Sequence, residues 1–306
     1  MIFVIVSVKN INSASVVSAL WLIIFCMEIG LTISFFIFIL ITMESKESEI
    51  ITSLDNPSIK LARSLLQRKN RKFYGAFLVE GERFVKEAII NAEGLEKIFV
   101  ESSYVDKYKD MLDRANCSVV VVSAKVLESL CETVTPQGIV AQVTMMPSIN
   151  FVPTQPFIVL DGLQDPGNMG TIIRSAVATN TPDIVLINTV DVFNPKVVRA
   201  SAGTLFHANF YPLSHEELLE ICEKYDYGLV VTEMFGQNVF DDPKMPDRYA
   251  LVIGNEGNGV SDVLLSHKDL GLTLPMNRKV ESLNAGVSAS ILLYLLKGKN
   301  INRGED

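Results

Sequence analysis

Three segments in the second half of the chain carry residues that could bind a small molecule and act on it. The first, residues 160–176, reads LDGLQDPGNMGTIIRSA and has the form of a strand, a turn and the start of a helix. Asn168 stands where an N-cap is expected, and Arg174 lies two turns into a helix whose neighbouring positions are mostly apolar. An arginine so placed needs a partner or a ligand. Taken by itself, this segment is explained more simply by a turn, a cap and a solvent-facing arginine.

The second segment, residues 251–261, reads LVIGNEGNGVS and predicts a strand that runs into a glycine-rich loop and a short helix. Glycines let backbone N–H groups approach a ligand closely, which suits a nucleotide-like cofactor, and we expect a side chain at Gly257 to block that approach. The segment is neither a GxGxxG fingerprint nor a phosphate loop ending in Lys-Ser/Thr, and ordinary turns use the same residues. Turn chemistry explains Glu256 less easily.

The third segment, residues 274–296, joins a polar loop to a helix. Ser282 lies just before the helix and Asn284 at its start, and both supply neutral polar groups. Small residues at the start of the helix would permit close backbone packing: Ala285, Gly286, Ser288 and Ala289. A capped terminal helix is the simpler explanation of this segment alone.

Composition limits the chemistry that these segments can perform. The four cysteines are scattered without a CxxC pair, and the three histidines lie outside all three segments, so no metal site and no disulfide framework is expected. This cysteine usage indicates a reducing, cytoplasmic compartment. The net charge of -8 argues against binding nucleic acid through bulk charge, so any such contact must rest on local basic patches.

The elements that must position these segments predict an α/β fold with a parallel sheet. Apolar strands are expected at 157–161, 183–187, 229–233, 249–254 and 272–275, and helices at 169–178, 196–202, 214–225 and 284–296. Such alternation favours a parallel sheet that is covered on both faces. Ligands of these sheets bind beyond the carboxyl ends of the strands, where the polar and glycine-rich segments fall.

The first half of the chain predicts a separate, smaller α/β domain over residues 43–145. A basic amphipathic helix is expected over 59–71, with strands at 77–81, 97–100, 118–123 and 138–143. Residues 146–156 are rich in proline and without periodicity, so they are predicted to link this domain to the second domain, residues 157–306.

A hydrophobic leader precedes both domains. Residues 13–42 are apolar except for Glu28 and exceed the roughly 20 residues that a membrane-spanning helix needs. The composition changes abruptly at Met43. We expect Met43 to be the functional start and residues 1–42 to be an extension, with a genuine membrane anchor over 13–42 as the alternative.

In their order and spacing, the three segments resemble the motifs of the SpoU (TrmH) family in the SPOUT methyltransferase superfamily. The matching residues are Asn168, Gly170, Arg174 and Ala176; Gly254, Glu256, Gly257 and Gly259; and Pro275, Met276, Ser282, Leu283 and Asn284. The resemblance covers residues 157–296. Residues 51–143 look like the small substrate-binding domain of ribosomal RNA members.

The resemblance implies S-adenosylmethionine as cofactor, a trefoil knot in the second domain and a homodimer. Carried over by position, the cofactor-binding residues would be Gly254, Gly257, Leu274, Met276 and Leu283. The reaction site would be lined by Arg174, Asn168, Glu256, Ser282 and Asn284. Arg174 is proposed as the base in this family, but a guanidinium stays protonated under ordinary conditions, so stabilising an alkoxide is the role that we favour here.

The resemblance also implies an RNA substrate, and one basic run offers a place for it. The run comprises Lys60, Arg63, Arg68, Lys69, Arg71 and Lys72, followed by Phe73 and Tyr74 for stacking. A solvated helix face is the ordinary explanation of such a run. The function implied is methyl transfer to a ribose 2′-hydroxyl of RNA, with ribosomal RNA expected. Transfer RNA as substrate, or a non-catalytic RNA-binding or ribosome-assembly factor, are the alternatives.

Overall fold

The computed structural model describes residues 50–145, 150–277, 279–280 and 282–297. The expectations for the leader, for a start at Met43 and for a membrane anchor all concern residues outside these ranges. Among the described residues, no helix has the length and apolar character needed to span a membrane. Contacts group the described residues from Ile50 onward into one unit, which contains two sheets.

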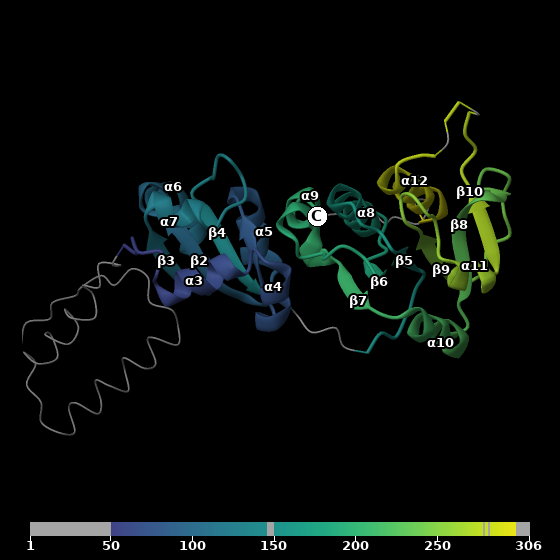
Figure 1. The fold of residues 1–306 in the computed structure, drawn as a ribbon, viewed down its shortest axis with the longest axis horizontal. Helices are drawn as coiled ribbons and strands as arrows, with labels where there is room; N and C mark the ends of the chain where they lie inside the picture. The colour runs from purple at the N-terminus through teal and green to yellow at the C-terminus, as the bar shows by residue number, and fades with distance from the viewer. Residues whose placement is uncertain (1–49, 146–149, 278, 281, 298–306) are drawn as a thin grey trace, which may run out of the picture. The chain divides into compact units, whose positions relative to one another are not determined.

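The first sheet has four strands in the order β1-β4-β2-β3. Strand β4 runs antiparallel to β1 and β2, while β2 and β3 are parallel. Apolar side chains are buried on both sides of this sheet, so it forms a three-layer unit with its helices (Figure 1). Its strands are β1 (Ala76–Glu80), β2 (Leu95–Glu101), β3 (Ser118–Val122) and β4 (Ile139–Thr144), and its helices are α3 (Pro57–Ser64), α4 (Arg68–Tyr74), α5 (Glu82–Asn91), α6 (Val105–Leu112) and α7 (Ala124–Glu128).

The single helix expected over residues 59–71 is two helices, because α3 ends at Ser64 and α4 begins at Arg68. The side chain of Arg71 stabilises the break. Its Nη1 donates hydrogen bonds of 2.8 Å to the carbonyl oxygens of Leu65 and Leu66, which lie just beyond the end of α3.

The same guanidinium holds Asp191, in the loop after β6 (Asp183–Ile187). Arg71 Nε and Nη2 lie 2.9 and 2.7 Å from Asp191 Oδ2, and the arginine side chain is only 3% exposed. Removing one partner of a buried ion pair typically costs about 3–5 kcal/mol, so this pair is a structural contact. The prediction that Arg71 contacts RNA is therefore wrong, since its donors are engaged inside the protein.

The second sheet confirms the predicted parallel architecture. Its six strands follow the order β10-β8-β9-β5-β6-β7, and every neighbouring pair is parallel. Strands β5 and β9 lie side by side in the middle and are buried along their whole length. The other strands are β7 (Asn209–Pro212), β8 (Gly228–Asn238) and β10 (Leu270–Thr273), with β5 at Phe157–Asp161 and β9 at Tyr249–Ile253.

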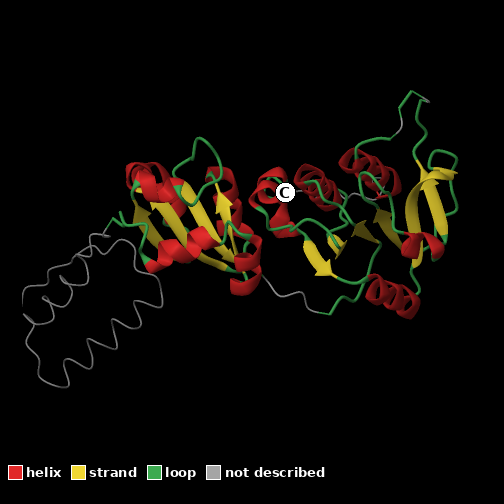
Figure 2. Ribbon diagram, viewed as in Figure 1, coloured by secondary structure: helices red, strands yellow, loops and turns green. Residues whose placement is uncertain are grey.

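Helices cover both faces of the second sheet (Figure 2). Helices α8 (Pro166–Ala178) and α12 (Ala285–Lys297) pack on one face, where Met169, Ile172 and Leu292 are buried. Helix α10 (His215–Tyr225) and the short α11 (Asp262–Ser266) pack on the other. Helix α9 (Pro195–Ala200) lies against α8 and β1. The trefoil knot stays a prediction.

Candidate active site

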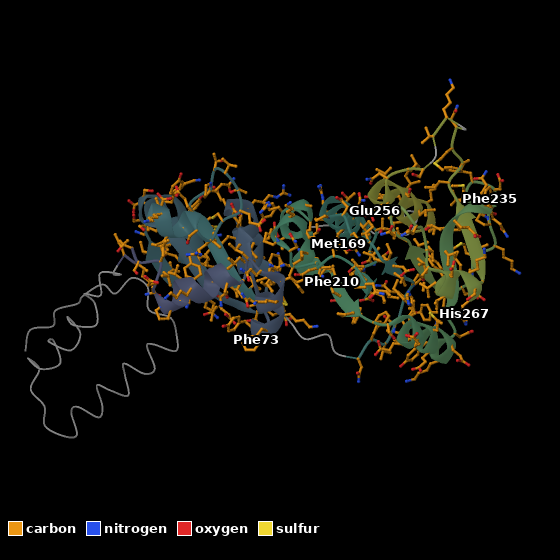
Figure 3. All side chains as sticks on the ribbon, viewed as in Figure 1. Phe73, Met169, Phe210, Phe235, Glu256 and His267 are labelled. Atoms are coloured by element: carbon orange, nitrogen blue, oxygen red, sulfur yellow. The ribbon has the colours of Figure 1, made fainter. Side chains whose placement is uncertain are left out.

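The Glu256 carboxylate joins the first two sequence segments at the carboxyl end of the parallel sheet. Glu256 lies in the loop between β9 and α11 (labelled in Figure 3), and its Oε1 accepts hydrogen bonds from Asn168 Nδ2 at 3.0 Å and from the Asp165 N–H at 3.1 Å. Its Oε2 accepts a longer hydrogen bond from the Gln164 N–H at 3.4 Å. These donors all belong to the loop after β5 and the first turn of α8. Because β5 and β9 are neighbours, their loops are placed to meet in this way.

Hydrogen bonds favour the ionised form of this carboxylate. Partial burial would raise the pKa of Glu256, but hydrogen bonds from the Asn168 side chain and from the backbone N–H groups of Glu256, Asp165 and Gln164 outweigh it, so the pKa lies below its usual value. The charge also sits near the amino end of α8, where the helix dipole favours an anion. Glu256 is therefore suited to positioning Asn168 and poorly suited to accepting a proton at neutral pH.

Two further contacts join the same pair of loops. Asn255 Nδ2 donates to the Gly162 carbonyl oxygen at 2.7 Å, while its Oδ1 accepts from the Gly257 and Asn258 N–H groups at 2.9 and 3.1 Å. At the far end of the glycine loop, the Ser261 N–H donates to Asp161 Oδ2 at 2.8 Å. The loop is thus attached to the β5 segment at its start, middle and end.

Within the loop itself, the glycine that leaves no room for a side chain is Gly254 and not Gly257, while the expectation that a side chain at Gly257 would block a ligand stays a prediction. A Cβ on Gly254 would lie 2.2 Å from the backbone of Gly259 and Val260, whereas one on Gly257 would meet nothing closer than 3.6 Å. The positive φ falls at Gly259, with a value of 70°. Neither lack of space nor a positive φ therefore requires glycine at position 257, and the Gly257 N–H donates to Asn255 Oδ1.

The third segment reaches the site because α12 packs on the start of α8. A Cβ on Gly286 would lie 3.2 Å from Thr171 Cβ and 3.3 Å from Asn168 Cα, so only a small residue allows this approach. Asn284 Oδ1 accepts a hydrogen bond from the Val287 N–H at 3.1 Å, as an N-cap does. The small residues predicted to permit close packing do so here.

Arg174 is exposed on α8, one helical turn beyond Thr171. No hydrogen bond or ion pair within the described ranges engages its guanidinium. Ser282 is also exposed, as are Met276 and Leu283, whereas Leu274 is partly buried against the core. Arg174 thus keeps its five donors available to a ligand.

Sequence reasoning missed Asn255, Gln164, Asp165 and Asp161, which hold the two loops together. These residue types are common in turns and helix caps. Their spacing does not indicate that each has a partner about a hundred residues away in the sequence. The usable signal was their place directly after buried strands, since neighbouring parallel strands bring such residues to one edge.

Comparison with known proteins identifies the family. Residues 155–294 match the SpoU rRNA Methylase family, and residues 56–141 match the MRM3-like substrate binding domain. The chain is 32% identical over 249 residues to the 23S rRNA (guanosine(2553)-2′-O)-methyltransferase RlmP of Bacillus subtilis, covering 81% of this chain and 99% of RlmP. The chain belongs to the SpoU rRNA methylase family.

Other SpoU relatives and structures agree with this assignment. The mitochondrial rRNA methyltransferase 3 of Xenopus laevis is 28% identical over 308 residues, covering 77% of this chain and 73% of that protein. AviRb from Streptomyces viridochromogenes, a SpoU methyltransferase crystallised with S-adenosylmethionine, superposes with a TM-score of 0.74 at 27% identity, covering 82% of this chain and all of AviRb. A putative TrmH-family RNA methyltransferase from Porphyromonas gingivalis gives 0.72 at 28% identity, covering 81% and 100%.

The lack of space at Gly254 gives a test of the packing described for the glycine loop. Replacing Gly254 by alanine would force the loop apart at Gly259, and overpacking of this kind typically costs about 1–3 kcal/mol. We expect Gly254→Ala to lower the free energy of unfolding by such an amount in denaturant titrations. The matched change Gly257→Ala has room for its methyl group and should stay within about 0.5 kcal/mol of the wild type. Equal stabilities of the two variants would contradict this description of the loop.

Proposed function

We propose that this chain transfers a methyl group from S-adenosylmethionine to a ribose 2′-hydroxyl of ribosomal RNA. The observation that carries the proposal is the convergence of three separate segments through Glu256, Asn168 and Gly286 at the carboxyl end of the parallel sheet. Membership of the SpoU family supports the reaction. The names of RlmP and of mitochondrial rRNA methyltransferase 3 support ribosomal RNA as the substrate.

The loops around Glu256 fit a cofactor that is recognised largely through backbone groups. At Gly259 an added Cβ would meet no atom within 4 Å, so the backbone there faces open space. Exposed apolar side chains at Met276 and Leu283 could cover part of a bound molecule. We propose that the cofactor is held by Gly254, Gly257, Leu274, Met276 and Leu283. When bound, S-adenosylmethionine supplies an electrophilic methyl group on a sulfonium.

The protein's task is then to orient the ribose hydroxyl and to stabilise the charge that develops on its oxygen. Arg174 is the exposed charged residue at the site whose donors are not engaged by the described protein, and a guanidinium remains charged throughout the reaction. We propose that Arg174 positions ribose or phosphate oxygens and stabilises the developing alkoxide. Asn168, Ser282 and Asn284 would supply neutral hydrogen bonds, and Glu256 would hold Asn168 in place.

Replacing Arg174 separates geometry from charge. We expect Arg174→Lys and Arg174→Ala to fold and to bind S-adenosylmethionine, and both to lose about 100- to 1,000-fold in single-turnover methyl transfer, as for one lost transition-state donor. Lysine keeps the charge but lacks the planar fork that orients two oxygens. Arg83→Lys, on an exposed face of α5, is the matched control and should retain full activity.

Two outcomes would contradict this role. Near wild-type turnover of Arg174→Lys with a new pH dependence would favour proton removal by residue 174. Loss confined to RNA affinity, with unchanged transfer at saturating RNA, would make Arg174 a substrate clamp. Absence of any methyl transfer by the wild-type chain, measured with a ribosomal RNA substrate and labelled cofactor, would contradict the proposed function as a whole.

The RNA contact is proposed to lie on α3 and α4, within the region that matches the MRM3-like substrate binding domain. Four basic side chains are exposed there without an ion pair to any described residue: Arg63, Arg68, Lys69 and Lys72. Lys60 is also exposed but pairs with Asp55 at 2.9 Å. Phe73 is 80% exposed and Tyr74 48%, and their rings meet edge to face. Exposed aromatic faces beside basic residues suit unstacked RNA bases.

Charge reversal at this surface tests the RNA contact. We expect the triple variant Arg68→Glu, Lys69→Glu, Lys72→Glu to weaken RNA binding and to flatten its salt dependence by roughly 0.7 per lost phosphate contact, while cofactor affinity stays unchanged. Arg71 is left intact because it is buried. The control is the triple variant Lys86→Glu, Lys109→Glu, Arg114→Glu, which changes the net charge by the same amount. Lys86 lies on α5, Lys109 lies on α6 and Arg114 follows α6. If the two triple variants bound RNA equally well, the basic run would be an ordinary solvated helix face and not an RNA contact.

We also propose that the chain acts as a homodimer in the cytoplasm. One face of α12 supports dimerisation, because it exposes three large apolar side chains: Val287 45%, Tyr294 51% and Leu295 38%. An RNA substrate supports the cytoplasmic location. Light scattering that gives the mass of a single chain, or recovery of the protein with membranes, would contradict these two statements respectively.

A further inference from the structure

Three side chains that the proposed reaction does not use form a cluster beneath the end of the glycine loop. Asp161, at the end of β5, is only 4% exposed. Its Oδ2 accepts the Ser261 N–H at 2.8 Å, and its Oδ1 lies 3.0 Å from Nε2 of His215, the first residue of α10. The Ser261 hydroxyl lies 3.1 Å from the same Nε2. Ser261 itself is the N-cap residue of α11.

The contacts determine which nitrogen of His215 carries a proton. A carboxylate oxygen only accepts hydrogen bonds, so an imidazole nitrogen 3.0 Å from Asp161 Oδ1 must donate. His215 is therefore protonated at Nε2, and this N–H also points to the Ser261 oxygen. A Ser-His-Asp catalytic triad requires the serine and the aspartate to bind different ring nitrogens. Because Asp161 and Ser261 share Nε2, the cluster is not a catalytic triad. Its contacts instead suit it to holding Ser261 in position.

We infer that His215 and Asp161 are positioning residues for cofactor binding, which they support by fixing the far end of the glycine loop at Ser261. This inference rests on the proposed function. Asn255 and Glu256 hold the start and middle of the loop, but Ser261 is held only by the Asp161 carboxylate and the His215 ring among the side chains described. A buried carboxyl group that loses a hydrogen-bond donor is costly, so His215 also holds the Asp161 side chain in place.

His215 belongs to α10, a helix that none of the three sequence segments contains. Asp161 belongs to the first segment and Ser261 to the second, so the cluster joins their outer ends, as Glu256 joins their middles. Release of Ser261 would leave Glu256 and Asn168 in contact. The expected consequence is weaker cofactor binding with little change in the rate of the chemical step.

The experiment compares His215→Gln with His215→Asn in the full chain. Glutamine can bring an amide N–H near the position of Nε2, whereas asparagine is one methylene shorter and cannot reach Asp161. We expect His215→Asn to raise the Kd for S-adenosylmethionine about 10-fold, which corresponds to about 1.4 kcal/mol, and to raise the KM for the cofactor in step. We expect His215→Gln to stay within about 3-fold of the wild type, and kcat and the KM for RNA to change little in both variants.

His267→Asn is the matched control, because His267 is exposed on the other end of α11 and contacts neither Asp161 nor Ser261. Identical cofactor affinities for His215→Asn and His267→Asn would overturn the inference. So would equal losses in both KM values and kcat that follow a lower Tm, since these would indicate general destabilisation. A wild-type chain that binds no S-adenosylmethionine would overturn the proposed function first, whereas normal wild-type binding with an unaffected His215→Asn variant would overturn this inference alone.

Discussion

The site depends on one ionised carboxylate that is placed where backbone and amide donors converge. Glu256 accepts hydrogen bonds from the Asn168 side chain and from the N–H groups of Gln164 and Asp165, which the loop after β5 and the start of α8 would otherwise leave without protein partners. Partial burial would raise the pKa of Glu256, and the donors outweigh this effect and favour the charged form. The geometry of the two loops and the ionisation of Glu256 therefore depend on each other.

Topology decides which contacts the three segments can make. Strands β5 and β9 are adjacent, so their loops meet directly, but β8 separates β9 from β10 and keeps the third segment one strand away. That segment reaches the site through α12, which approaches α8 closely at Gly286. A glycine favours this approach because two helices meet closely here, whereas the stricter requirement at Gly254 arises where two parts of one loop meet.

The sequence predicted the parallel sheet, its covering helices and the three segments, because strand periodicity and helix caps are local properties. It could not predict which glycine is essential. Whether a Cβ fits at Gly254 or Gly257 depends on backbone that returns from elsewhere in the loop. For a similar reason, the sequence predicts an RNA contact for Arg71 and no role for His215. Their partners, Asp191 and Asp161, lie far away in sequence, and a charged residue looks alike in a pattern whether it is solvated or buried.

Some charged residues of this protein bind partners inside the protein, and others keep their hydrogen-bonding groups free for a ligand. Glu256, Asp161 and Arg71 are engaged by internal partners, so they fix positions, whereas Arg174 is exposed with its donors open. The engaged groups also connect distant parts. Gln164, which donates its N–H to Glu256, donates from its side chain to the Asn188 carbonyl at 2.7 Å, and three residues later Asp191 binds Arg71 of α4. Residues 188–191 thus link the loop beside the glycine segment to α4, the helix that carries several of the exposed basic residues.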